Sequence, residues 1–320
     1  MSGEELDAED AWHTVRKYGL WRLVMDSFLR FRFGDGFTSS RALALQVALG
    51  VVPFMLAMTG LAADIDADRE TQVLASTISA LTPGSGSNDL LASALAKGET
   101  AERAGEIALA FGLAFAVISM VTAVAQIERG SNRIYGIPRD RPAVWKYGRA
   151  AVMTLILAAP TAAGFALLVA GGPFGDAMQD AYGWTESTDR VWDVARWPLG
   201  LAVTTLTIAV LMNHTPRRRQ PALSWLGLGA AVSVALTMMA SALLGVYVNY
   251  SASFGSVYGP LAGVMALLLW CYLTSIALFL GTAMAAQLEA MHARVTDPTT
   301  DDPGPARRRR PAVREEERLP

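Results

Sequence analysis

The sequence predicts an all-α fold: a polytopic membrane bundle of six transmembrane helices with a cytoplasmic N-terminal amphipathic helix. Three observations predict it. The 320 residues are 52% hydrophobic and only 18% charged, whereas soluble domains average about 25% charged residues. The charges are clustered between apolar runs of about 20 residues, which is the length that crosses a bilayer. Finally, Lys and Arg are alternately frequent and rare in the segments between these runs.

The apolar runs give the six spans in chain order. The first four contain no charged residue and lie at Ala42–Ala63, Ile107–Ile127, Ala151–Val169 and Trp197–Met212. The longest charge-free run extends from Gln220 to Leu288, and its 69 residues are too many for one span. Its middle, Asn249–Pro260, is rich in Gly and ends in Pro, and these residues stop one helix and start another. Helices five and six are therefore predicted at Leu223–Val248 and Pro260–Leu288.

The distribution of Lys and Arg predicts the orientation. The N-terminal segment, the second and fourth loops and the C-terminal tail hold 22 of these residues, and the other three loops hold 5. Cytoplasmic loops carry the excess of Lys and Arg, so both termini are predicted in the cytoplasm. The preference for Arg over Lys, with abundant Ala, Gly and Val, suggests a GC-rich bacterial genome. The expected location is therefore the bacterial cytoplasmic (inner) membrane.

Three regions are expected along the chain. Residues 1–41 form a cytoplasmic segment, in which residues 12–33 have the spacing of an amphipathic helix. This helix either lies on the anionic inner leaflet or packs beneath the bundle. Residues 42–290 form the transmembrane domain, whose first outside loop contains two short helices, Thr71–Leu81 and Asp89–Ala96. Residues 291–320 are rich in Pro and charge, which is typical of a disordered tail.

The residue patterns of common catalytic sites do not occur. His13, His214 and His292 stand apart, without the spacing of metal ligands. Cys271 is the single cysteine, so no intrachain disulfide is possible. There is no phosphate-binding Gly-rich loop of the GxxxxGK[ST] type. We therefore expect no enzyme activity, no metal and no cofactor. No charged residue lies deep in a predicted span, which argues against a proton relay.

Uncharged polar residues and helix-end residues are the candidates for function. Pro53 is expected to kink the first helix and free a backbone carbonyl. Each polar candidate also suits a structural role, such as a bridge between two helices for Gln46 or the aromatic belt at the membrane surface for the tyrosines. The residues predicted to line a cavity or to have another polar function are Gln46, Asn132, Arg133, Asn249, Tyr250 and Tyr258.

Two motifs resemble the YihY/BrkB family of bacterial inner-membrane proteins. The segment Ile127–Ile137, Ile-Glu-Arg-Gly-Ser-Asn-Arg-Ile-Tyr-Gly-Ile, is similar to the ALNxIYGV-like segment that follows the family's second helix. The segment Tyr247–Gly259, followed by Leu-Leu-Trp-Cys-Tyr-Leu at 268–273 and by Gly281, is similar to the pattern YxxxxxxYxxxYG…LLWLYL…G. The likeness extends over residues 20–290. The family often has a Glu soon after the Gly of helix six, whereas here Thr-Ala-Met follows, and Glu289 is the candidate substitute.

The resemblance implies a polytopic membrane protein with a role in transport or in the handling of envelope lipids. We predict a transporter-like or lipid-handling protein whose partners are membrane lipids and a lipid or small-molecule substrate. The alternative is a non-catalytic membrane scaffold whose loops and tail bind partners. Members of the family have been called ribonucleases, but the chain has no pattern of nuclease metal ligands. We therefore expect neither that activity nor nucleic-acid binding.

Overall fold

The computed structural model describes residues 6–64, 102–183, 185–250 and 262–294, and every element within them is helical. Two short helices come first, α1 (Ala8–Tyr18) and α2 (Leu20–Phe33). The long helices that follow are α3 (Gly36–Asp64), α6 (Glu102–Ile134), α7 (Ala143–Phe165), α9 (Glu186–His214), α10 (Leu223–Tyr250) and α12 (Ala262–His292). A π-helix, η2 (Ala166–Ala170), joins α7 to α8 (Gly171–Tyr182).

Five segments among the described residues are long and apolar enough to cross a membrane: Ala110–Ile134, Ala143–Val169, Ser187–His214, Leu223–Val248 and Ala262–His292. They correspond to predicted helices two to six, so the all-helical membrane fold is confirmed to that extent. Predicted helix one lies within α3, a helix of 29 residues that is not among these five. The two short helices predicted in the first outside loop and the C-terminal tail lie outside the described residues.

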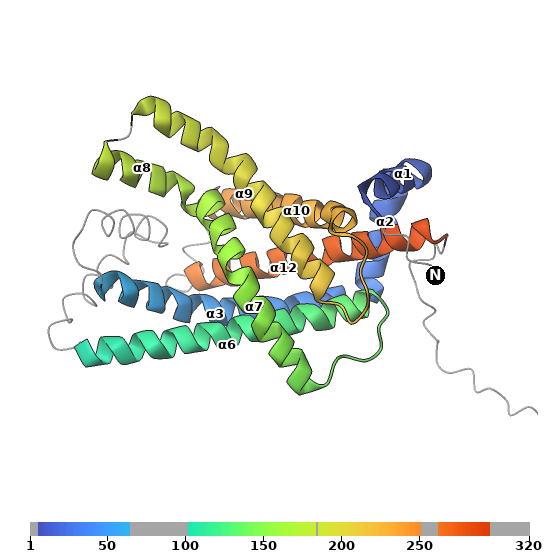
Figure 1. Cartoon of the computed structure of the whole chain (residues 1–320), viewed down its shortest axis with the longest axis horizontal. Coiled ribbons are helices and arrows are strands. Elements are labelled where there is room, and N and C mark those ends of the chain that lie inside the picture. The colour runs from blue at the N-terminus through green and yellow to red at the C-terminus, as the bar shows by residue number, and fades with distance from the viewer. Residues whose placement is uncertain (1–5, 65–101, 184, 251–261, 295–320) are drawn as a thin grey trace, which may run out of the picture.

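The described residues of the N-terminal segment, of the second and fourth loops and of the end of α12 meet at one end of the bundle, where α1 and α2 lie (Figure 1). Direct contacts join these segments in pairs: Arg133 with Asp35, Arg141 with Thr215, and Arg218 with Glu289. We call this end of the bundle the basic end. Because the N-terminus of α3 and the ends of α6, α9 and α12 all reach it, consecutive long helices run in opposite directions.

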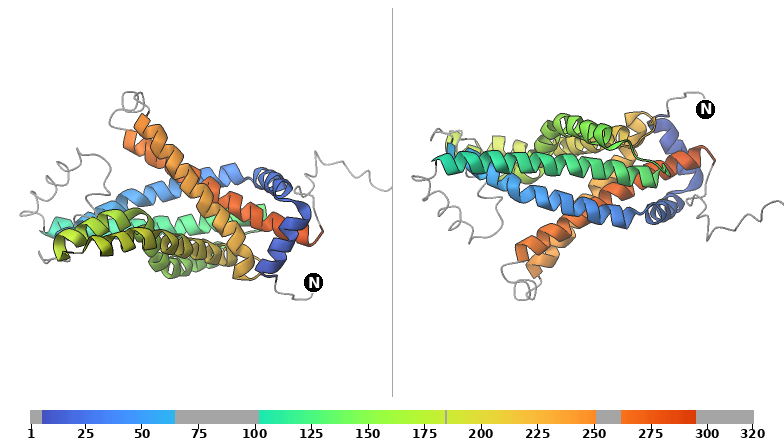
Figure 2. Two further views of the ribbon diagram at one scale, coloured as in Figure 1. Left: turned by 90° about the horizontal axis from the view of Figure 1, so that it is seen from above. Right: turned by 90° about the horizontal axis from the view of Figure 1, so that it is seen from below.

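The buried interior is concentrated toward the basic end. In α12, every buried residue lies from Cys271 to Met291, and none lies in 262–270. In α10, the described side chains beyond Val234 include one buried hydrophobic residue, Leu244. Figure 2 shows why: toward the opposite end, α10 and α12 stay together but diverge from α3 and α6. We call residues 235–250 of α10 and 262–270 of α12 the splayed pair.

Small residues hold α10 against α12 near the basic end. A Cβ added to Gly229 would lie 2.6 Å from the carbonyl oxygen of Gly281. A Cβ added to Gly281 would in turn collide with Ser233 and with the carbonyl oxygen of Gly229. Small residues let membrane helices approach until their backbones touch, and the resulting packing is a main source of stability between such helices.

The N-terminal segment differs from the single amphipathic helix predicted at residues 12–33. It forms two helices, because Gly19 has φ = 85° and breaks the helical path between α1 and α2, a conformation that Gly adopts without steric cost. Ala11, Leu23 and Phe31 are buried in the bundle, and a further set of residues is exposed: Trp12, Leu20, Trp21, Val24, Met25, Phe28 and Phe33. The segment therefore packs on the bundle and still presents an apolar outer surface.

One predicted helix boundary is also corrected. The fourth span was predicted at Trp197–Met212, but α9 begins at Glu186, so the charged residue Arg196 lies within a candidate span. Charged side chains in the first turns of α9 pair with each other along the helix, as Arg196 does with Asp193, one turn away, at 3.1 Å. The fifth span, in contrast, was predicted at Leu223–Val248, which is the apolar segment of α10, and the helix itself ends two residues later at Tyr250.

The close approach of α10 and α12 predicts that Gly281→Ala lowers stability. The added methyl group overpacks the crossing, which costs about 1–3 kcal/mol, and the midpoint of thermal unfolding in detergent should fall. Gly227→Ala on α10 is the matched control, because nothing lies within 4 Å of its added Cβ. That variant should unfold at or above the wild-type temperature. Equal midpoints for Gly281→Ala and the wild type would contradict the packing.

Candidate functional site

The end of α6 positions the first group of site residues. Gly136 has φ = 70°; Ile137 N–H donates to the carbonyl of Asn132 at 2.8 Å, and Gly136 N–H donates to that of Arg133 at 3.0 Å. This pair of bonds is the Schellman ending of a helix, which favours Gly in the left-handed position. The Tyr-Gly-Ile part of the family-like motif thus ends α6 and turns the chain toward α7.

Asn132 links two connections of the bundle. Its side chain is fully buried, its Nδ2 donates to Asp140 Oδ1 at 3.0 Å, and its Oδ1 accepts a bond from the backbone N–H of Arg217 at 2.8 Å. Asp140 also pairs with Lys146 at 3.2 Å. Burial alone would raise the pKa of Asp140, but the hydrogen bonds from Asn132 and Lys146 and the nearby positive charges hold it below its ordinary value. The carboxylate therefore stays ionised and keeps these donors in place.

Arg141 caps the end of α9. It donates to the carbonyls of Thr215 at 3.1 Å and Pro216 at 3.2 Å, and it pairs with the buried Glu128 at 2.9 Å. The last carbonyls of a helix have no partner within the helix and attract positive charge. Because Glu128 belongs to α6 and Arg141 to the α6–α7 connection, this contact fixes the start of the α9–α10 connection against α6.

A second group of polar residues, which we call the arginine cluster, lies beside the first and consists of Arg30, Tyr135, Arg218, Gln220, Gln287 and Glu289. Arg30 Nε donates to Gln287 Oε1 at 2.7 Å. Arg218 pairs with Glu289, and its guanidinium carbon lies 4.5 Å from the ring centroid of Tyr135. The cluster joins α2, the end of α6, the α9–α10 connection and α12.

The structure separates the residues that the sequence predicted to line a cavity. Gln46 accepts a hydrogen bond from Thr122 at 2.9 Å and so bridges α3 and α6, which is the structural role considered for it. Arg133 is exposed and pairs with Asp35 at 3.0 Å. Tyr250 is 86% exposed at the end of α10. Pro53 lies inside α3, Asn249 lies in the last turn of α10, and Tyr258 falls outside the described residues.

Sequence reasoning missed most of the arginine cluster. The sequence of α2 did contain a signal for Arg30. Arg30 follows Leu23 by seven residues and therefore lies on the helix face that buries Leu23, Ser27 and Phe31. A charged residue on a buried helix face indicates a polar partner from another element. Gln287 gives no comparable signal, because a single Gln in an apolar helix does not reveal which element it meets.

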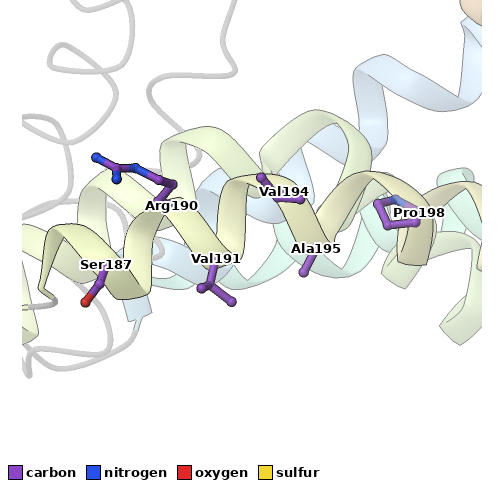
Figure 3. A pocket seen from close by; sticks show the side chains of 6 residues that line it. All are labelled: Ser187, Arg190, Val191, Val194, Ala195 and Pro198. Carbon is purple, nitrogen blue, oxygen red and sulfur yellow. The ribbon is translucent and has the colours of Figure 1, made fainter.

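Two open surface grooves are lined by residues that belong to neither polar group. One, of about 530 Å³, is lined by residues of α9 alone: Ser187, Arg190, Val191, Val194, Ala195 and Pro198 (Figure 3). Another, of about 440 Å³, lies between α9 and α10 and includes Leu206 and Gly227. Within the described part of the chain, no three His, Cys, Asp or Glu side chains come together as metal ligands would.

Comparison with known proteins places this architecture among membrane proteins. Residues 27–305 match the family model described as virulence factor BrkB. The chain is 24% identical to the putative ribonuclease-like protein YfkH of Bacillus subtilis over 83% of its own length and 94% of that protein. It is 26% identical to a UPF0761 membrane protein of Chromohalobacter salexigens, over 87% of its own length and 64% of the relative's. No solved structure matches the chain.

The buried contact between Glu128 and Arg141 predicts that Arg141→Gln strongly destabilises the protein. Removing one partner of a buried pair leaves an uncompensated charge and costs about 3–5 kcal/mol, and here two backbone carbonyls also lose their donor. Arg133→Gln is the control, because its pair with Asp35 is exposed, and exposed pairs contribute about 0–1 kcal/mol. Thermal unfolding in detergent should show a large drop for the first variant and little change for the second. Similar midpoints for both variants would contradict the assigned role of Arg141.

Proposed function

The chain belongs to the BrkB family of membrane proteins, whose model covers residues 27–305, and we propose that it is a six-span protein of the cytoplasmic (inner) membrane that handles membrane lipids in a transporter-like manner. In this proposal α3 is the remaining span, and both termini lie in the cytoplasm. The single observation that supports lipid handling best is the unequal burial along the bundle: the basic end is closed, and the splayed pair is not.

The charge distribution supports the orientation. The N-terminal segment, the second and fourth loops and the tail are the parts rich in Lys and Arg, and their described residues meet at the basic end. Positively charged loops stay in the cytoplasm, so the basic end faces the cytoplasm and the splayed pair faces the outer leaflet. The outer surface of α2 combines the exposed Trp21 and Phe28 with Arg22 and Arg32, which suits contact with the anionic inner leaflet.

The splayed pair supports contact with lipid chains on more than one side. Its exposed side chains are apolar, and those of α10 and α12 include Met239, Leu243, Val246, Val264 and Leu268. A helix that is hydrophobic all round is buried in protein or in lipid, and these turns are not buried in the protein. Lipid chains beside the splayed pair would therefore lie next to α3 and α6 as well as at the bundle surface. A protein that guides a lipid needs such contact on more than one side.

We propose this function without catalysis. The name of the Bacillus subtilis relative describes a ribonuclease-like protein. The described polar residues at the basic end do not support a nuclease role for this chain, because they bond one another and the helix ends. The charged groups at the basic end serve to close it, and binding rather than bond cleavage is the role proposed for the protein.

The proposed topology predicts the activity of reporter fusions. A reporter that works only in the cytoplasm should be active when fused after Pro138 or Pro216, and inactive when fused after Gly84 or Ser187. The reason is that the first two positions lie in Arg-rich connections, whereas Gly84 lies in a loop poor in Lys and Arg and Ser187 lies at the start of α9, at the end opposite to its Arg-rich connection. Activity in intact bacterial cells is the measurement. An active fusion after Gly84 would contradict the six-span arrangement.

The proposed lipid handling predicts that the protein speeds the movement of a fluorescent phospholipid between the leaflets of proteoliposomes. Gly245→Trp and Gly263→Trp should slow this movement several-fold, because each places an indole in open space beside the splayed pair, where an added Cβ meets nothing within 4 Å. The fraction of fluorescent lipid that a membrane-impermeant quencher reaches over time is the measurement.

Gly148→Trp is the matched control for these variants. It too has open space around an added Cβ, but it lies near the start of α7 at the basic end, so lipid movement should equal that of the wild type. A wild-type rate no higher than that of protein-free vesicles would contradict lipid movement and would favour the scaffold alternative. Equal slowing by all three variants would mean that the splayed pair is not the lipid path.

A further inference from the structure

The arginine cluster carries more positive than negative charge in a place that is largely shielded from water. Arg30 meets a neutral partner, Gln287, at 2.7 Å, whereas Arg218 meets the carboxylate of Glu289. Two guanidinium groups thus share one carboxylate. Charges that are removed from water are normally paired, so the cluster lacks one negative charge.

Several polar atoms of the same cluster have no hydrogen-bond partner although they are buried. They are the Tyr135 hydroxyl, Arg218 Nε, and both the oxygen and the nitrogen of the Gln220 side-chain amide. Gln220 and Tyr135 are within reach of each other, and this polar contact acts to lower the pKa of the Tyr135 hydroxyl, but its geometry is too poor for a full hydrogen bond. Buried polar groups in folded proteins are almost always bonded to protein, water or an ion. Four such atoms from three neighbouring residues indicate that protein contacts alone do not complete the site.

The local electrostatics agree with a missing anion. Burial lowers the pKa of Arg30, Tyr135 and Glu289 raise it, and the positive charge of Arg218 lowers it. Burial raises the pKa of Tyr135, so its hydroxyl stays neutral and able to donate. The two guanidinium groups therefore repel each other across a site that also offers neutral donors, and an added negative charge would relieve that repulsion.

We propose that the arginine cluster binds a phosphate group through Arg30 and Arg218, with Tyr135 and Gln220 as neutral partners. The planar guanidinium fork matches phosphate oxygens, which accept several charge-assisted bonds at once. Arg218 gives access from outside, because 28% of its side chain is exposed. One monoanion restores the charge balance. The phosphate belongs to the headgroup of an anionic phospholipid or to free phosphate, and both sources share this chemistry.

Thermal unfolding of the purified full-length protein in a neutral detergent tests this proposal without requiring any movement of lipid, so its outcome is separate from that of the proteoliposome experiment. A ligand that binds the folded state raises the unfolding midpoint with its concentration. The probes are inorganic phosphate and short-chain phosphatidylglycerol, each compared with chloride at equal ionic strength. A rise with phosphate identifies a site for free phosphate, and a rise with phosphatidylglycerol alone identifies a lipid headgroup site. No rise above chloride with either probe overturns the proposal.

Substitutions assign the effect to the cluster. Arg30→Gln and Arg218→Gln should each weaken the apparent affinity by about tenfold or more, since each removes charged hydrogen bonds to the phosphate. Glu289→Gln should strengthen it several-fold, because the carboxylate competes with phosphate for Arg218. Arg32→Gln is the matched control, an exposed arginine of the same helix as Arg30, and should leave affinity unchanged. Each variant is compared with itself without ligand, so a loss of stability does not hide the result. Wild-type affinity in both Arg30→Gln and Arg218→Gln, or weaker binding in Glu289→Gln, overturns the assignment.

Discussion

The arrangement of the bundle depends on the hydrogen bonds of Asn132. This buried amide is satisfied by Asp140 on one side and by the backbone of Arg217 on the other, so it ties the α6–α7 connection to the α9–α10 connection. Arg141 adds a second tie by bonding the carbonyls that end α9 while it pairs with Glu128 of α6. Between membrane helices the surrounding lipid supplies no hydrophobic driving force for association, which makes such polar ties and close helix packing the main determinants of how the helices are arranged.

These ties lie at one end of the bundle only, and this asymmetry has a structural consequence. Near the basic end, Gly229 and Gly281 bring α10 and α12 into backbone contact, and Trp225, Phe279 and Leu288 are buried around them. Toward the other end, α10 and α12 contact each other, as through Trp270 and Ser241, but most of their apolar side chains are exposed or only half-buried. A bundle that is fixed at its basic end and less closely packed toward the other combines a rigid base with a surface that lipid chains can reach, and the proposed function uses both.

The arginine cluster differs from the ties around Asn132 in how completely its groups are satisfied. The side-chain oxygen and nitrogen of Asn132 both have partners and Glu128 leaves one oxygen without a partner, whereas Arg218, Gln220 and Tyr135 together keep four buried atoms without one. A network whose members are all bonded rigidifies a fold, and a network that is only partly bonded is costly unless something else completes it. The first network is therefore structural in this protein, and the second has the properties of a site that receives a ligand.

The sequence by itself determined the membrane character, the family and the approximate limits of the helices, because these follow from local hydrophobicity, from charge alternation and from motifs such as Ile127–Ile137. It even contained the reason for the end of α6, since the Gly after Tyr135 adopts a positive φ. The tertiary structure alone decided which polar residues meet. Gln46 became a bridge to Thr122, Tyr250 stayed exposed, and Arg30 reached Gln287 across 257 positions of the chain. Contacts of that separation depend on how helices cross and on which faces they turn toward each other, and neither hydropathy nor the spacing of residues in one helix specifies the face of another.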